Sequence, residues 1–180
     1  MKHSIFTGIL IFFYFSATSH PVFINIELQP ISCQSYNYNI IVNIIYPESS
    51  DILFGGIEVG FGDGVILEFS RSDMDRSSLK NEMTLFQKKF NHAFPGPGNY
   101  TIGARTFNRS ANIINMKNSV NTPLYLETKI LLDPNFGCNT IPHLENYTYP
   151  FIKSGQNYNF DFSFIDNEDD SVSFSFTSAL

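Results

Sequence analysis

Few residues of this 180-residue chain could do chemistry, and their spacing limits which chemistry that could be. The chain has four histidines. Two of them, His3 and His20, lie near its start, which leaves His92 and His143 as candidate bases or metal ligands. The sequence contains no G-x-S-x-G, no G-x-x-x-x-G-K-[ST] and no H-E-x-x-H, the spacings that build a nucleophile elbow, a phosphate cradle or a zinc site. We therefore predict that the chain is not an enzyme.

The best candidate metal site is the acidic stretch 166–170, which holds four carboxylates and one amide. Its carboxylates offer the hard oxygens that Ca²⁺ prefers, and they belong to Asp166, Glu168, Asp169 and Asp170. The stretch resembles the acidic turns that bind Ca²⁺ between cadherin-like repeats, but it lacks the ligand order of an EF-hand. The alternative is a solvated acidic turn. We take that interpretation, and we predict no cofactor and no calcium dependence for this chain alone.

The composition excludes several classes of protein. The net charge is -6, 43% of the residues are hydrophobic and only 16% are charged. A disordered chain would be poorer in aromatic residues, of which there are 19 Phe and 9 Tyr. Binding of nucleic acid through its phosphates needs a basic face, which this charge disfavours. Many Phe, Tyr and Ile residues favour strands, and many Asn residues disfavour helices, so a helical bundle is not expected.

The first 19 residues have the order of a secretory signal peptide. A basic start at Lys2 precedes the apolar run Ile5–Phe15, and Ala17 and Ser19 then stand at positions -3 and -1 of a cut before His20. The run is shorter than the ~20 apolar residues that a membrane-spanning helix needs. We therefore expect a secreted or cell-surface protein without a transmembrane segment.

Residues 20–134 read as a series of strands, because apolar and polar residues alternate with period two. In Val22–Leu28 and Tyr36–Tyr46 the apolar residues share one face, and asparagines such as Asn25 and Asn43 are expected on the wet face. Further strands are predicted at Gly56–Phe61, Val65–Phe69, Thr84–Phe94, Tyr100–Phe107, Ala111–Met116 and Leu124–Leu132. The stretch Ser72–Glu82 lacks this pattern and is expected to be a long polar loop, with a helical turn as the alternative. The spacing predicts an all-β, immunoglobulin-like antiparallel sandwich.

A second β unit is predicted after a linker at residues 135–146. In residues 147–180 alternation resumes on both sides of an acidic hairpin at Asp166–Asp170. Two or three strands do not bury so many Phe side chains unaided. We therefore expect an incomplete second domain, with the chain being the front piece of a longer polypeptide. The alternative is that the terminal hairpin packs on the first domain.

The only two cysteines, Cys33 and Cys138, are candidates for a disulfide. Export to an oxidising compartment permits the bond. Cys33 lies in the turn after the first predicted strand and Cys138 follows the last, so if the seven main strands alternate up and down, both cysteines lie at one end of the sandwich. A loop of ~100 residues closed in this way is worth about 4–5 kcal/mol in the chain-entropy model. The alternative is a pair of buried or idle thiols.

Two turns carry the most distinctive residues. Gly62 and Gly64 can take positive φ without a Cβ clash, and Asp63 between them can fold onto backbone N–H groups as an Asx turn. The alternative for Asp63 is a catalytic acid. The stretch 95–98 shapes a corner through Pro95 and Gly98 before the Tyr100 strand. We interpret His92, just before this corner, as a structural histidine rather than a ligand.

These motifs resemble the two signatures of PKD (polycystic kidney disease) domains. The family pattern W-x-F-G-D-G is similar to the sequence around Gly60–Gly64, and H-x-Y-x-x-P-G-x-Y-x-V is similar to His92–Ile102. The chain has Glu58 or Val59 where the family has Trp, and Phe94 in place of its Tyr. The segment 118–128 also resembles part of PKD-containing surface proteins of gliding Bacteroidetes, as does the later acidic hairpin. The resemblance implies a PKD-like sandwich, displayed outside the cell in a long protein.

These observations favour a non-catalytic structural or adhesive module of a larger bacterial cell-surface protein. Its partners would be other domains of the same chain, and surface proteins or polysaccharide. The alternative is a carbohydrate-binding accessory domain of a secreted hydrolase. That function calls for a planar row of exposed aromatic residues, whereas the chain has no Trp and most Tyr and Phe occupy core positions.

Overall fold

The computed structural model describes residues 23–48, 55–80, 82–109, 113, 116–137, 139–144, 155, 157, 159, 163–168, 173 and 175. The predicted signal peptide, most of the predicted second unit, and Cys138, Asp169 and Asp170 lie outside these residues. Among the described residues, no helix has the length and apolar character needed to cross a membrane.

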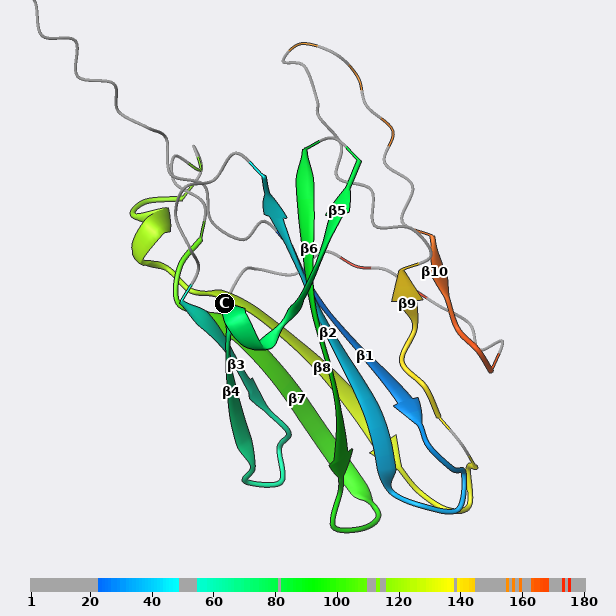
Figure 1. The fold of residues 1–180 in the computed structure, drawn as a ribbon. Helices are drawn as coiled ribbons and strands as arrows, with labels where there is room; N and C mark the ends of the chain where they lie inside the picture. The colour runs from blue at the N-terminus through cyan, green and yellow to red at the C-terminus, as the bar shows by residue number, and fades with distance from the viewer. Residues whose placement is uncertain are drawn as a thin grey trace, which may run out of the picture.

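The regular secondary structure of the described residues consists of antiparallel strands and two short 3-10 helices (Figure 1). In chain order the elements are β1 (Phe23–Pro30), β2 (Asn37–Pro47), β3 (Gly56–Gly60), β4 (Ile66–Ser70), the 3-10 helix η1 (Arg71–Asp73), β5 (Asp75–Leu79), β6 (Met83–Ala93), β7 (Gly98–Thr106), the 3-10 helix η2 (Ser119–Asn121), β8 (Leu124–Leu132), β9 (His143–Leu144) and β10 (Phe164–Ile165). One sheet has the order β1-β2-β6-β5 and the other β4-β3-β7-β8, while β9 and β10 pair separately. The predicted all-β sandwich is confirmed.

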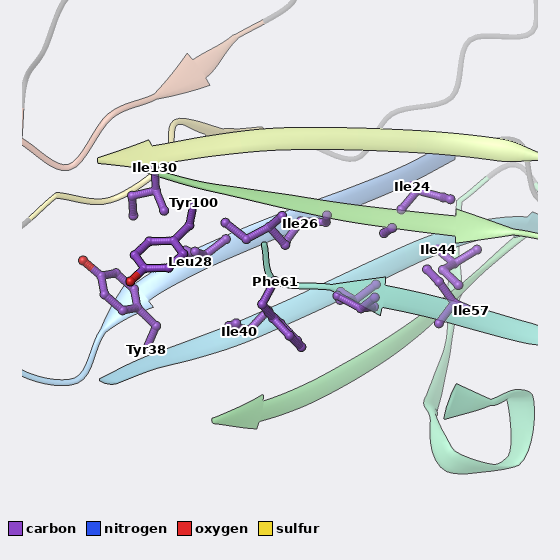
Figure 2. Packing of buried hydrophobic residues seen from close by; sticks show 14 of the residues in the cluster. Ile24, Ile26, Leu28, Tyr38, Ile40, Ile44, Ile57, Phe61, Tyr100 and Ile130 are labelled. Carbon is purple, nitrogen blue, oxygen red and sulfur yellow. The ribbon is translucent and has the colours of Figure 1, made fainter. Parts of the chain in front are cut away.

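The core lies between the two four-stranded sheets, where the alternating apolar residues meet. From β2, Ile40, Val42 and Ile44 are fully enclosed, and they face a layer from the other sheet that includes Val59 and Ile102. Figure 2 shows two tyrosines of this cluster, Tyr38 and Tyr100, together at one end of the core. Each such buried aliphatic side chain contributes about 1.5–3 kcal/mol. Period-two alternation thus predicts the inner faces correctly.

The outer face of β2 departs from the expected wet surface. Asn43 is fully buried, and its amide is satisfied on both sides: Nδ2 donates to Glu27 Oε1 at 2.8 Å, and Oδ1 accepts from Gln87 Nε2 at 2.8 Å. Asn25 pairs with Asn43 in register and is also buried. The physical reason is position in the sheet, because β2 lies between β1 and β6 and polar side chains of both neighbours close over it.

Two predictions between the strands are wrong. The stretch Ser72–Glu82 is not a loop: it holds the end of η1 and all of β5, an edge strand whose residues are mostly exposed. Strand alternation is absent there because neither face of this edge strand enters the core, and polar residues suit an exposed edge. The predicted strand Ala111–Met116 is not a strand at its described positions. There the N–H of Met116 donates to the Ile113 carbonyl at 3.0 Å, which forms a turn.

The second half of the predicted linker is attached to the sandwich. The hydroxyl of Tyr38 donates to the Asn139 carbonyl at 3.3 Å, Thr140 is buried, and Ile141 packs against the core. Also within the predicted linker, His143 pairs with Ile165 in the ladder of β9 and β10. The segment therefore has fixed contacts on both sides, where the sequence predicts only a connection.

Candidate functional site

His92 and Asp63 form a close pair that joins the two sheets. His92 lies near the end of β6, and Asp63 lies in the turn from β3 to β4, which belongs to the opposite sheet. The His92 Nε2 atom is 2.7 Å from Asp63 Oδ2, and the side chains are only 9% and 4% exposed. The His92 ring stacks on Phe61, with centroids 4.0 Å apart, and meets Phe94 edge-on at 4.7 Å. Aromatic packing thus encloses the pair.

The β3–β4 turn holds the Asp63 carboxylate in place. Its Oδ1 atom accepts a hydrogen bond from the Val65 N–H at 3.0 Å, which closes an Asx turn. Gly62 has φ +75, and a Cβ there would lie 2.8 Å from the backbone N and O of Thr101. Burial raises the pKa of Asp63, but the hydrogen bonds from Val65 and His92 and the attraction to His92 outweigh it, so its pKa lies below the usual 3.8.

The corner between β6 and β7 lies at the same end of the sandwich (Figure 1). The hydroxyl of Tyr100 donates to the Gly96 carbonyl at 3.0 Å, and its ring packs on Phe94 with centroids 4.6 Å apart. All seven predicted motif residues therefore lie in or beside two neighbouring turns: Gly62, Asp63, Gly64, His92, Pro95, Gly98 and Tyr100. Their contacts are those of a structural corner.

A groove of about 380 Å³ lies on the outer face of the β4-β3-β7-β8 sheet. Its floor includes two outward-facing glycines, Gly60 of β3 and Gly103 of β7, which are cross-strand partners. Ile66 of β4 stands on one side and is 62% exposed, and Tyr125 of β8 stands on the other and is 40% exposed. A Cβ on Gly103 would lie 2.9 Å from the Tyr125 hydroxyl and 3.2 Å from its ring, so Tyr125 leans over this glycine.

Charged groups line one end of the groove. Arg105 and Glu58 are cross-strand partners and pair through two contacts of 3.1 Å, Nε to Oε1 and Nη2 to Oε2. The Tyr125 hydroxyl donates to Glu127 Oε2 at 3.0 Å. Burial, together with the hydrogen bond to Glu127 and its charge, raises the pKa of Tyr125, so the phenol stays neutral at physiological pH. The groove therefore combines an aromatic ring, a floor with two glycines, one of them covered by that ring, and hydrogen-bond donors beside acceptors.

The acidic hairpin uses its described carboxylates as hydrogen-bond acceptors. Glu168 Oε2 accepts from the Thr140 N–H at 3.1 Å and from its hydroxyl at 2.6 Å, while Asp166 Oδ1 accepts from the Glu168 N–H at 3.0 Å. Among the residues that the structure describes, no group of three or more His, Cys, Asp or Glu could hold a metal. Asp169 and Asp170 lie outside those residues, so the calcium alternative is not tested.

Cys33 is disulfide-bonded. It lies in the β1–β2 turn and lines a small cavity of about 60 Å³ together with Asp133, Pro134 and Gly137 from the segment after β8. The only other cysteine of the chain is Cys138, next to Gly137 but outside the described residues. The pairing of Cys33 with Cys138 stays a prediction.

Sequence reasoning missed the His92–Asp63 pair and the groove. The pair joins residues 29 positions apart, and only the order of the two PKD-like signatures hinted that their turns meet. A weaker sequence signal for the groove is the presence of glycine at one outward position in each of two predicted strands, Gly60 and Gly103. Tyr125 was likewise assigned to no face, although it alternates with Leu124 and Leu126.

Comparison of the chain with known protein families, with curated proteins and with solved structures finds no match.

Proposed function

We propose that this chain is a non-catalytic extracellular module of a larger bacterial cell-surface protein, with a PKD-like, immunoglobulin-type sandwich that serves as spacer and adhesive surface. The strand orders support this fold type. When the eight strands β1 to β8 are lettered A, B, C, C′, D, E, F and G along the chain, the sheet β1-β2-β6-β5 has the order A-B-E-D. The sheet β4-β3-β7-β8 has the order C′-C-F-G, and both orders occur in immunoglobulin-type sandwiches. The PKD-like signatures lie in the β3–β4 and β6–β7 turns.

The enclosed His92–Asp63 pair is the observation that carries the proposal. Both groups are among the sequence candidates for acid-base chemistry, and the 2.7 Å contact joins them to each other beside the rings of Phe61 and Phe94. A general base must reach the proton that it abstracts. Here the pair instead ties one sheet to the other, which suits a stiff building block.

The disulfide at Cys33 supports the extracellular location. Disulfides persist in oxidising compartments and are rare in a reducing cytosol. A rigid sandwich then presents its loops and open sheet faces for contact. Other domains of the same chain, surface proteins or polysaccharide are the partners that suit such a module.

Location and redox state test the proposal in the bacterial host. Cells that carry a tagged copy of the gene are treated with trypsin without lysis, and thiols of the denatured, unreduced protein are labelled. We expect the tag to be lost from intact cells, a mature protein that begins at His20, and no free thiol. A copy that lacks residues 1–19 serves as the cytoplasmic control and should resist trypsin. Retention of the complete chain inside the cell would overturn the proposal.

A further inference from the structure

We propose that the groove on the outer face of the β4-β3-β7-β8 sheet binds a neutral carbohydrate chain, with the ring of Tyr125 as the stacking surface. The inference rests on the proposed extracellular function and names the ligand class of one of its surfaces. The volume of about 380 Å³ is in the ~300–1,000 Å³ range of small-ligand sites.

The floor of the groove allows close approach to the sheet. Gly60 and Gly103 lie side by side on β3 and β7. The Tyr125 side chain covers Gly103, whereas a Cβ on Gly60 would meet only the Ile66 side chain at 3.8 Å, so the sheet is open to a ligand at Gly60. Tyr125 leans over Gly103 from one side, and Ile66 borders Gly60 from the other. The exposed part of the Tyr125 ring and the Ile66 side chain are apolar surfaces against which the C–H face of a pyranose ring can pack.

The polar side chains of the groove, Glu58 and Arg105, suit the hydroxyl groups of a neutral ligand better than the charged groups of an ionic one. The Glu58 carboxylate accepts and the Arg105 guanidinium donates, and the two groups lie 3.1 Å apart, half-exposed at the guanidinium. A sugar hydroxyl both donates and accepts, so two neighbouring hydroxyls can bond to such a pair at once. Because Arg105 and Glu58 balance each other, Glu127 adds a negative charge beside Tyr125 and the chain carries a net charge of -6, the site disfavours polyanions and phosphates.

An extended peptide is a poorer occupant. Peptides that add to a sheet bond to the backbone of a free edge strand, whereas the floor strands β3 and β7 lie in the interior of the sheet, paired with each other and with β4 and β8. Their backbone groups are engaged in the ladders. A ligand on this face must therefore bind to side chains, by hydrogen bonds and by stacking on the Tyr125 ring. A sugar can make both kinds of contact.

The test uses the purified full chain without residues 1–19 and a panel of soluble neutral polysaccharides: β-glucan, xylan, galactomannan and starch. Affinity electrophoresis measures retardation by each polymer, and an oligosaccharide of the best polymer is titrated while amide NMR signals are followed. We expect retardation by at least one neutral polymer, with shifts centred on residues 60–64 and 103–105. Polygalacturonate serves as the polyanionic probe and should retard the protein less.

Four variants make the assignment specific. Tyr125→Ala should weaken binding by about tenfold, which corresponds to 1.4 kcal/mol for the lost stacking surface, whereas Tyr125→Phe should retain binding. Gly60→Val adds a branched side chain to the floor at a strand position with ordinary φ and should block binding without unfolding the protein. Phe136→Ala removes an aromatic residue that is 76% exposed elsewhere on the chain and is the matched control.

Each contrary outcome is distinguishable. The inference is overturned by the absence of retardation on every neutral polymer, by binding to polygalacturonate alone, or by equal binding of wild type, Tyr125→Ala and Gly60→Val. Concentration-dependent dimerisation that Tyr125→Ala abolishes would instead assign the face to a second copy of the chain. None of these binding results affects the trypsin experiment on intact cells, which measures where the protein is located. The proposed function is therefore tested independently of the groove.

Discussion

The imidazole of His92 and the carboxylate of Asp63 meet at 2.7 Å across the boundary between the two sheets. The contact connects β6 of one sheet to the β3–β4 turn of the other, at the end where the β6–β7 corner also lies (Figure 1). Because both side chains are nearly inaccessible to water, the pair is screened less than a surface ion pair. Its loss should therefore be measurable as a change in stability.

Stability should fall in acid through Asp63. The folded-state pKa of Asp63 lies below its ordinary 3.8, so its ionised form is favoured by folding. The resulting stability is fully present above the ordinary pKa and is lost as the pH falls through the lower folded-state pKa. We expect Asp63→Asn to unfold about 1.5–3 kcal/mol more easily at pH 7 and to lose less stability than wild type below pH ~4. Urea unfolding at a series of pH values measures both effects.

Glu68→Gln is the control for the acid series, because it removes one negative charge from an exposed position on β4. Parallel pH profiles for wild type and Asp63→Asn would contradict the role of the pair.

The two glycines that flank Asp63 should differ in their tolerance of alanine. Both have positive φ, but a Cβ on Gly62 would strike the Thr101 backbone at 2.8 Å, whereas a Cβ on Gly64 meets nothing within 4 Å. Gly64→Ala should cost about 1–2 kcal/mol from its backbone conformation alone, and Gly62→Ala should cost more. Thermal unfolding of the two variants side by side decides the point. Equal losses would mean that the turn moves away from β7 at no cost.

Removal of the Tyr100 hydroxyl should loosen the β6–β7 corner. Tyr100→Phe keeps the ring on Phe94 but deletes the 3.0 Å hydrogen bond to the Gly96 carbonyl. We expect a loss of about 1 kcal/mol in the free energy of unfolding. Tyr125→Phe is the matched control, since its hydroxyl bonds to Glu127 on an exposed face and should matter less. If the two variants are equally stable, the corner does not depend on this bond.

The disulfide at Cys33 should stabilise the sandwich. Thiol labelling of the denatured, unreduced protein should find no free thiol, and reduction should release two. Reduction should also lower the free energy of unfolding by up to about 4–5 kcal/mol, the chain-entropy value for a loop of ~100 residues. The detection of two free thiols before reduction would contradict the predicted disulfide between Cys33 and Cys138.

Calcium should leave the melting temperature unchanged. The Glu168 carboxylate already accepts two hydrogen bonds from Thr140, and Asp166 accepts one from the Glu168 backbone. Differential scanning calorimetry with calcium and with a chelator checks this expectation. A calcium-induced rise that Asp166→Ala abolishes would show that the hairpin is a metal site.

The inner faces of the strands were predictable because burial imposes a period of two. Ile40, Val42 and Ile44 all lie where alternation places them. Where burial does not follow this period, alternation predicts the wrong environment. Asn43 is buried on the outer face of an interior strand, and β5 is an edge strand with no apolar face, so neither carries the expected signal.

The candidate sites were predictable only in part, for a different reason. Glycine and aspartate chemistry predicts a turn at Gly62–Gly64, which is local. The meeting of Asp63 with His92, and of Gly60 with Gly103, depends on which strands become neighbours. Strand order is a property of the whole chain, and no spacing within one segment reports it.

The position of Cys33 affects how the module would respond to pulling. In the proposed function, tension on the chain would enter through β1 in one sheet and leave after β8 in the other. Cys33 follows directly after β1, so if Cys138 is its partner, force passes from the first strand through the sulfur bridge to the exit. The intervening strands are then bypassed, and the module would stay nearly inextensible under load even if its core melted.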